Sequence, residues 1–213
     1  MIKGIIFDLD GTLLDTSLDL TSAVNNTMIK YHLDTFTNEE IITKVGNGMA
    51  KLIQRCLPEG KEDLFDEVYD CFTKEYAKTY LDKTIAYDGI VELLKELNKR
   101  NILIGVNTNK NSEYVTNLLN DRFKEIEFFK VIGNRKGIPG KPDPLGTNEI
   151  IEEMKLDKEE VLYVGDSDTD ILTAINANIK CAWVSWGYRS YEEIKDLKPQ
   201  FQIHSANEIL DLI

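Results

Sequence analysis

Apolar and polar positions follow three successive rhythms along the chain. Near the amino terminus, a short and continuous apolar run at residues 5–7 is typical of a buried strand. Between residues 16 and 82 the apolar residues recur at the spacing of one helix face, and no run there resembles a strand. From residue 88 onward, short apolar runs alternate with amphipathic segments.

The middle rhythm predicts a group of helices and the points at which they stop. The expected helices cover residues 16–33, a segment from Asn38 to the turn at 46–48, residues 49–56, and residues 62–81. The last of them carries an aromatic stripe made of Tyr69, Phe72, Tyr76 and Tyr80. We expect this stripe to pack against the neighbouring helices rather than to bind a ligand.

The last rhythm predicts a parallel sheet. The expected strands are 5–7, 102–106, 130–133, 161–164, 181–184 and 201–203, and the helices between them are 89–100, 112–120, 144–155, 169–176 and a short one from 206. Apolar strands that alternate with amphipathic helices form parallel sheets covered on both faces. The chain is therefore expected to adopt an α/β fold, a doubly wound, Rossmann-like core of residues 1–14 and 84–213 with an all-helical domain, residues 15–83, inserted after the first strand.

Composition and net charge limit the cellular location and the classes of partner that we expect for this protein. A chain of 213 residues can bury a substantial core, and its three cysteines form no CxxC pair, so we expect reduced thiols. The first residues lack the features of a signal peptide, and no apolar run reaches membrane-spanning length, which favours a cytoplasmic protein without membrane contact. The net charge of -12 argues against nucleic acid as a partner. An anionic substrate would need a metal or local cations.

The first strand leads into two carboxylates, Asp8 and Asp10, in the sequence Asp-Leu-Asp-Gly-Thr. Ligands of open parallel sheets bind beyond the carboxyl ends of the strands, and side chains two positions apart on an extended segment point to the same side. Both acids are thus expected to face one ligand. The alternative is structural, because Asp-Gly is a common turn and an acid at a strand end often caps a helix.

Three other strand ends carry polar residues with two interpretations each. Thr108, with the backbone amides that follow it, suits a phosphate oxygen or caps the next helix. Lys141 lies beside Pro142 and near Pro144, which either fix a cation rigidly or start a helix. The strand at residues 161–164 ends in an acidic cluster, Asp166, Asp168 and Asp170, that suits a ligand or a helix cap.

Taken together, these strand ends favour a metal. If Asp8, Asp10 and Asp166 converge, each pair of charges 4 Å apart repels by about 4 kcal/mol at an effective dielectric constant of 20. A cation would remove this cost. Carboxylate ligands without a nearby histidine or cysteine indicate a hard ion, and Mg²⁺ fits best.

These four motifs, in this order, resemble the haloacid dehalogenase superfamily of phosphohydrolases, and the resemblance covers essentially the whole chain. The helical insertion after the first motif resembles the small alpha-helical (C1) cap class. Val45-Gly46-Asn47-Gly48, Thr108-Asn109-Lys110 and Gly140-Lys141-Pro142-Asp143-Pro144 are similar to segments of phosphoglycolate phosphatases. The second acid, Asp10, is absent from the dehalogenases proper and favours phosphorus chemistry.

The resemblance implies a Mg²⁺-dependent phosphatase that hydrolyses a small phosphorylated metabolite, with phosphoglycolate as the first candidate, through an aspartyl-phosphate. Asp8 would be the nucleophile and Asp10 the proton shuttle. The metal ligands would be Asp8, Asp10 through its backbone carbonyl, and Asp166, with Asp170 in the outer shell because Gly165 and Ser167 flank Asp166. The residues that hold the substrate would be Gly11, Thr12, Asn47, Thr108, Asn109 and Lys141. A monomer or homodimer is expected.

Rival functions remain open. A beta-phosphoglucomutase-like enzyme would use the same intermediate to return the phosphate to a sugar. A phospho-accepting signalling module also combines acids, a hydroxyl and a lysine on a parallel sheet, but such modules lack the helical insertion and the late acidic cluster. A serine hydrolase centred on Ser167 lacks the closing glycine and a nearby histidine.

Overall fold

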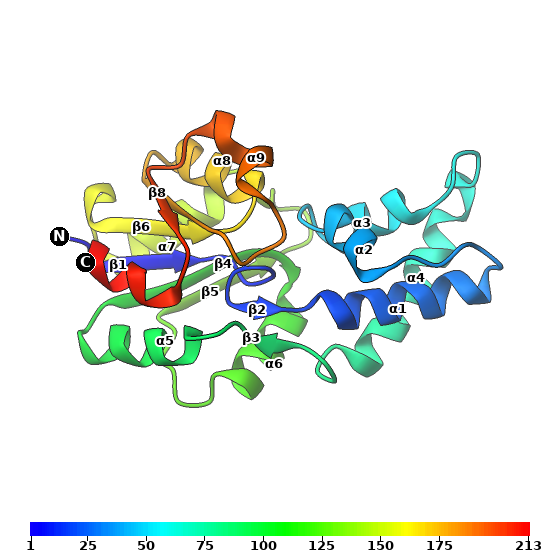
Figure 1. Ribbon diagram of the computed structural model, residues 1–213, viewed down its shortest axis with the longest axis horizontal. Helices are drawn as coiled ribbons and strands as arrows, with labels where there is room; N and C mark the ends of the chain where they lie inside the picture. The colour runs from blue at the N-terminus through cyan, green and yellow to red at the C-terminus, as the bar shows by residue number, and fades with distance from the viewer.

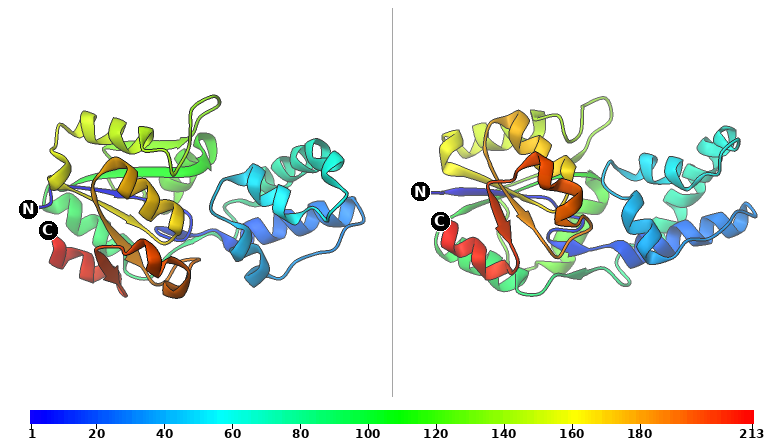
Figure 2. Two further views of the ribbon diagram at one scale, coloured as in Figure 1. Left: turned by 90° about the horizontal axis from the view of Figure 1, so that it is seen from above. Right: turned by 45° about the horizontal axis from the view of Figure 1, so that its top comes forward.

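Two bodies of different construction make up the computed structural model, which describes residues 1–213 (Figure 1). One contains the sheet, both chain ends and most of the helices, and the other contains only helices. Figure 2 shows that the two are joined by a narrow connection, which gives the molecule an elongated outline.

A six-stranded parallel sheet forms the centre of the larger body. Its order is β5 (Lys130–Asn134), β4 (Leu103–Asn111), β1 (Gly4–Phe7), β6 (Val161–Gly165), β7 (Lys180–Val184) and β8 (Phe201–Ile203). β1 is buried along its whole length because it lies between β4 and β6. The predicted α/β fold with a parallel sheet is confirmed.

Alternate residues of β1 point into two separate hydrophobic cores. Ile5 and Phe7 pack with one set of helices, whereas Ile6 packs with the other. The first set contains α5 (Ile90–Lys99), α6 (Ser112–Arg122) and the 3-10 segment η4 (Ala206–Leu212). The second contains α7 (Leu145–Met154), α8 (Asp168–Ala177) and the short α9 (Tyr191–Ile194). The sheet is thus covered on both faces, as continuous apolar strands require.

The helical body has a core of its own. It contains α1 (Ser17–Lys30), α2 (Asn38–Lys44), α3 (Met49–Cys56), η1 (Glu62–Leu64) and α4 (Phe65–Thr79). The longest two, α1 and α4, pack against each other (Figure 1). In the predicted aromatic stripe, Phe72 and Tyr76 are fully buried and their rings stack 5.8 Å apart, while Tyr69 and Tyr80 are half-buried. The stripe therefore packs, as expected. We call this body the cap.

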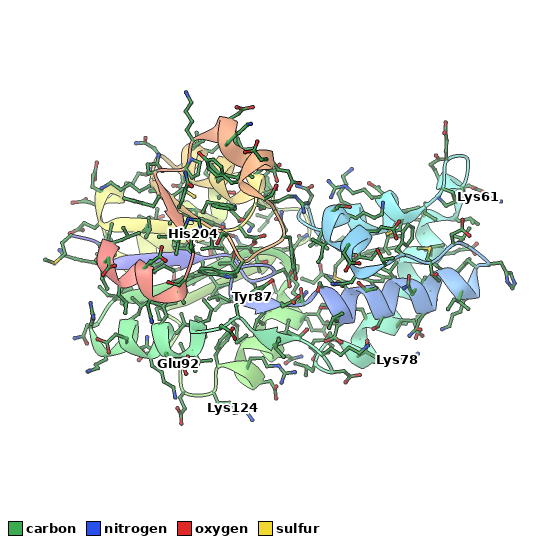
Figure 3. All side chains as sticks on the ribbon, in the orientation of Figure 1. Lys61, Lys78, Tyr87, Glu92, Lys124 and His204 are labelled. Atoms are coloured by element: carbon green, nitrogen blue, oxygen red, sulfur yellow. The ribbon has the colours of Figure 1, made fainter.

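Two very short strands connect the bodies. β2 (Leu14–Asp15) and β3 (Ile85–Ala86) pair antiparallel where the chain leaves and re-enters the core. The buried carboxylate of Asp19 accepts hydrogen bonds from the amides of Lys83 and Thr84, which ties the start of α1 to the returning segment. Tyr87, labelled in Figure 3, follows β3 at this junction.

The structure differs from the sequence-based expectation in a few elements. β4 continues through Thr108 to Asn111 instead of ending near Val106, because Asn107 and Asn111 still pair with β5, with an irregularity between them, and residues 107–110 are buried. The segment from Ala206 is a 3-10 helix, and α9 was not expected because it has a single turn. None of the helices combines the length and the apolar character that crossing a lipid bilayer requires.

Candidate active site

The carboxylate of Asp8 lies at the carboxyl end of the central strand, where its backbone amide continues the pairing with β6. Its Oδ1 accepts a hydrogen bond of 2.6 Å from the amide of Leu9 and lies 2.8 Å from Nζ of Lys141. Its Oδ2 has no hydrogen-bond donor from the protein. One oxygen of Asp8 is therefore held in place, and the other is available to a ligand.

Asp8 belongs to a cluster of three buried acids. Carboxylate oxygens of Asp8, Asp166 and Asp170 lie within 4.8 Å of one another. Asp166 follows β6, and its two oxygens accept hydrogen bonds from Thr12 Oγ1 at 3.0 Å and from the amide of Tyr188 at 2.7 Å. The sequence thus brings together acids that are more than 150 positions apart.

Asp170, the last acid of the cluster at residues 166–170, both caps a helix and contacts the site lysine. Its Oδ2 accepts hydrogen bonds from the amide and hydroxyl of Ser167 at 3.0 and 2.7 Å, so it completes the capping box of α8. Its Oδ1 accepts a hydrogen bond of 2.6 Å from Lys141. Because Oδ2 caps α8 and Oδ1 contacts the Lys141 ammonium, whose charge would repel a cation, Asp170 suits a supporting position better than direct contact with an ion.

The charges in this cluster do not balance. Burial raises the pKa of Asp8 to about 7, and burial with the nearby Asp170 and Asp8 raises the pKa of Asp166 to about 8. Burial alone would lower the pKa of Lys141, but Asp170 and Asp8 outweigh it and raise that pKa. One lysine thus faces three acids. Oxygen ligands with excess negative charge are the donor set that Mg²⁺ prefers, so these residues fit a divalent ion.

Gly11 and Thr12 support Asp166. Gly11 has φ +86, a conformation that favours glycine, and a Cβ on it would lie 2.6 Å from Oδ2 of Asp166. The Thr12 hydroxyl donates to the other oxygen. In the structure both residues serve this acid, and their predicted contact with substrate stays a prediction.

The side chain of Asp10 is not part of the three-acid cluster. Its Oδ1 accepts a hydrogen bond of 2.6 Å from Thr16 Oγ1 and lies 3.0 Å from Nζ of Lys110. This lysine is almost fully buried, and its ammonium lies over the ring of the cap residue Tyr76 at 4.9 Å from the centroid. Only the backbone carbonyl of Asp10 is thus left for the predicted contact with the metal.

The end of β4 carries Thr108 and Asn109. Both are buried and line the same cleft as Asp8 and Asp166. The side chain of Asn109 donates to the carbonyl oxygens of Lys141 at 3.0 Å and of the cap residue Gly46 at 3.3 Å. Asn109 therefore connects the lysine loop to the cap.

The cleft lies between core and cap and has an empty volume of about 560 Å³, part of it open to solvent. The cap contributes a largely apolar wall made of Leu20, Val45, Gly46, Gly48, Met49 and Leu52. Asn47 does not line it, because its side chain hydrogen-bonds Thr169 Oγ1 at 3.1 Å and Arg55. Its predicted role in binding substrate stays a prediction.

Two site residues were not found from the sequence. Tyr188 and Arg189 line the cleft from the loop after β7. Lys110 was noted only as part of a family-like segment, and its pairing with Asp10, 100 positions away, has no local signal. Contacts made by loops of this kind depend on the packed fold, which the local pattern does not describe.

Comparison with known proteins finds relatives in one hydrolase family. The sequence model of the haloacid dehalogenase-like hydrolases matches residues 5–184. The phosphoglycolate phosphatase of Vibrio parahaemolyticus is 32% identical over 219 residues, which cover 100% of this chain and 96% of that protein. The phosphoglycolate phosphatase of Pseudomonas fluorescens is 31% identical, with 97% and 78% covered.

Solved structures are similar over the full length. A protein from Lactobacillus delbrueckii subsp. bulgaricus superposes with a TM-score of 0.93 at 29% identity, covering 99% of this chain and 98% of that one. A predicted phosphoglycolate phosphatase from Haemophilus somnus gives a TM-score of 0.90 at 26% identity, covering 99% and 97%.

Proposed function

The chain belongs to the haloacid dehalogenase-like hydrolase family and is a phosphoric monoester hydrolase, and from this premise we propose that it hydrolyses phosphoglycolate with the help of Mg²⁺. The observation that carries the proposal is the position of Asp8, whose carboxylate lies among two further acids and Lys141 at the carboxyl end of β1. The choice of substrate is supported by relatives named phosphoglycolate phosphatase that are similar over the full chain.

In the proposed reaction, Asp8 attacks the phosphorus of the substrate. Lys141 and the amide of Leu9 hold Oδ1, so the free Oδ2 forms the new bond while the bond to the leaving oxygen breaks. The product of this step is an aspartyl-phosphate, which water then hydrolyses. Covalent catalysis of this kind divides one difficult displacement into two easier ones.

Asp10 is the proposed proton shuttle. It would donate a proton to the leaving oxygen in the first step and accept one from the attacking water in the second. Its hydrogen bond from Thr16 and its ion pair with Lys110 fix the carboxylate at the edge of the cleft. That position, outside the three-acid cluster, suits proton transfer better than ligation.

Asp8, Asp166 and the backbone carbonyl of Asp10 would hold Mg²⁺, with Asp170 behind them. When bound, the ion would neutralise part of the acids' charge and polarise a phosphoryl oxygen. The remaining phosphoryl oxygens have three proposed donors, which are the Thr108 hydroxyl, the Lys141 ammonium and the backbone amide of Asn109. This arrangement offers local positive charge to an anionic substrate on a protein of net charge -12.

Residues 15–83 are proposed to act as the cap that covers the leaving group and excludes water. A small cleft suits a short leaving group such as glycolate. A beta-phosphoglucomutase-like enzyme would need room for a whole sugar on the cap side.

A panel of phosphorylated metabolites tests the proposal. With Mg²⁺, purified protein should release inorganic phosphate from phosphoglycolate faster than from sugar phosphates. A mutase would instead return an isomeric sugar phosphate and little free phosphate. Release of no phosphate from any member of the panel would refute the proposal.

A further inference from the structure

One short loop of the core contacts the acidic cluster, the cap and the hinge, which is the connection between the two bodies at Thr16, β2 and β3. It consists of residues 186–189, between β7 and α9. The indole of Trp186 donates to the carbonyl of Thr12 at 3.1 Å, and the amide of Tyr188 donates to Asp166 Oδ2 at 2.7 Å. Gly187 allows this approach, because a Cβ there would lie 2.1 Å from Cβ of Asp166.

The same loop reaches the hinge through the Tyr188 side chain. Its hydroxyl accepts a hydrogen bond of 3.0 Å from the amide of Thr16 and lies 3.2 Å from Thr16 Oγ1. Thr16 directly precedes α1, the first helix of the cap. The loop is therefore fixed to the point at which the chain leaves the core.

Arg189 extends from this loop into the cap. Its guanidinium donates hydrogen bonds to the carbonyl oxygens of Ile42 at 2.9 Å, Val45 at 2.6 Å and Thr43 at 3.3 Å. These carbonyls lie at the carboxyl end of α2, where a helix has unpaired acceptors and partial negative charge. Arg189 forms no ion pair with a carboxylate, so α2 is its main partner.

The segment held in this way forms part of the cleft wall. Val45 and Gly46 follow α2 and line the cleft beside Asp8 and Asp166. Asn109 also reaches the carbonyl of Gly46, but with one hydrogen bond of 3.3 Å. Among the contacts from the core to residues 42–48, Arg189 makes three hydrogen bonds and is the only charged donor; the others are the one from Asn109 and the one between Asn47 and Thr169.

We propose that Arg189 is a positioning residue that holds the turn at residues 45–48 over the site and so shapes the space for the leaving group. Through Tyr188, the same loop supports Asp166, so the cap wall and the acidic cluster share one support. The effect on catalysis rests on the proposed function, since it assumes that the cleft receives the substrate. The positioning of the turn by Arg189 does not depend on the proposed function.

Amide hydrogen exchange on the full chain without ligand tests the hold directly. Arg189→Met should speed exchange in residues 41–48 by about ten-fold, the effect of losing hydrogen bonds of ordinary strength, and leave the central strands unchanged. Arg189→Lys should give a smaller increase, because one ammonium cannot reach three carbonyls. Arg100→Met is the matched control, because Arg100 is exposed on the core and pairs only with Glu96.

Kinetics distinguish a positioning role from direct contact with substrate. For Arg189→Met we expect kcat/KM on phosphoglycolate to fall about ten-fold, while inhibition by inorganic phosphate, which needs only the core, changes less than about two-fold. Unchanged exchange at residues 41–48 in both Arg189 variants would overturn the proposal. A parallel loss of phosphate inhibition would also overturn it, because Arg189 would then act at the phosphoryl site.

The two proposals fail in different ways. If the wild-type protein hydrolyses no phosphomonoester, the proposed function is wrong, and the exchange experiment still decides whether Arg189 holds the cap. If Arg189→Met does not fold, Arg189→Lys carries the test in both assays. Normal hydrolysis with normal exchange in that variant would refute the role of Arg189 alone.

Discussion

The ammonium of Lys110 lies 3.0 Å from Oδ1 of Asp10, and the lysine side chain is 1% exposed. The pair joins the end of β4 to the loop after β1, and the same ammonium lies over Tyr76 of the cap. Burial alone would lower the pKa of Lys110, but Asp10 and Tyr76 outweigh it and raise that pKa, so the lysine stays charged. Asp10 thus has a permanent cationic partner.

This pair predicts an effect on proton transfer. Lys110→Met should lower kcat about ten-fold or more for substrates with a basic leaving group, because Asp10 loses the partner that orients it. For p-nitrophenyl phosphate, whose leaving group needs little protonation, the loss in the phosphorylation step should be smaller. Single-turnover rates with both substrates measure the difference. Equal losses for the two leaving groups would argue against a role through Asp10.

The acidic cluster predicts a stability that depends on pH and metal. The folded-state pKa values of Asp8 and Asp166, about 7 and about 8, lie above the ordinary carboxyl value of 3.8. The folded protein therefore binds more protons than the unfolded chain between these values, and without metal its stability should fall as pH rises from about 4 to about 8. The melting temperature in EDTA should decrease over this range.

Added Mg²⁺ should reverse that loss. The increase in melting temperature on adding Mg²⁺ should be larger at pH 8 than at pH 6, because at lower pH the ion competes with protons on the same carboxylates. Asp166→Asn serves as the comparison, since it weakens one proposed ligand and removes one repelling charge. If Mg²⁺ stabilised this variant as much as the wild type, Asp166 would not be a ligand.

The close approach of Gly11 to Asp166 predicts that a side chain at position 11 destabilises the protein. Gly11→Ala places a side chain at φ +86 and 2.6 Å from a carboxylate oxygen, so it should destabilise the fold by at least about 1–2 kcal/mol and weaken the response to Mg²⁺. Gly137→Ala is the matched control, because Gly137 has φ +77 with no atom within 4 Å of the new Cβ. Denaturant unfolding of both variants separates backbone strain from the clash. Equal losses would show that the contact with Asp166 is unimportant.

The sequence indicates those parts of the structure that local patterns determine. The apolar run before Asp8 predicts β1, and the rule that ligands bind at the carboxyl ends of parallel strands predicts that Asp8, Lys141 and Asp166 lie at one edge of the sheet. The helix lengths of the cap follow from its apolar spacing and from turns such as Gly46-Asn47-Gly48.

Features that depend on long-range packing do not follow from local patterns. β2 and β3 have two residues each, too few for a periodicity. The rotation of the Asp10 side chain toward Lys110 is set by the packing of the loop after β1 against the end of β4. The reach of Arg189 to α2 is set by how the two bodies meet. The direction of Asn47, toward Thr169 instead of the cleft, has the same cause.

The central claim is that Asp8 accepts the phosphoryl group, and trapping that intermediate tests it most directly. The protein is mixed with substrate and Mg²⁺, quenched in acid during turnover, digested, and analysed by mass spectrometry, with Asp8→Asn as the control. We predict a phosphorylated peptide in which Asp8 carries the group, and neither that peptide nor turnover in Asp8→Asn. Full turnover by a folded Asp8→Asn protein, or phosphate found on another residue, would contradict the account.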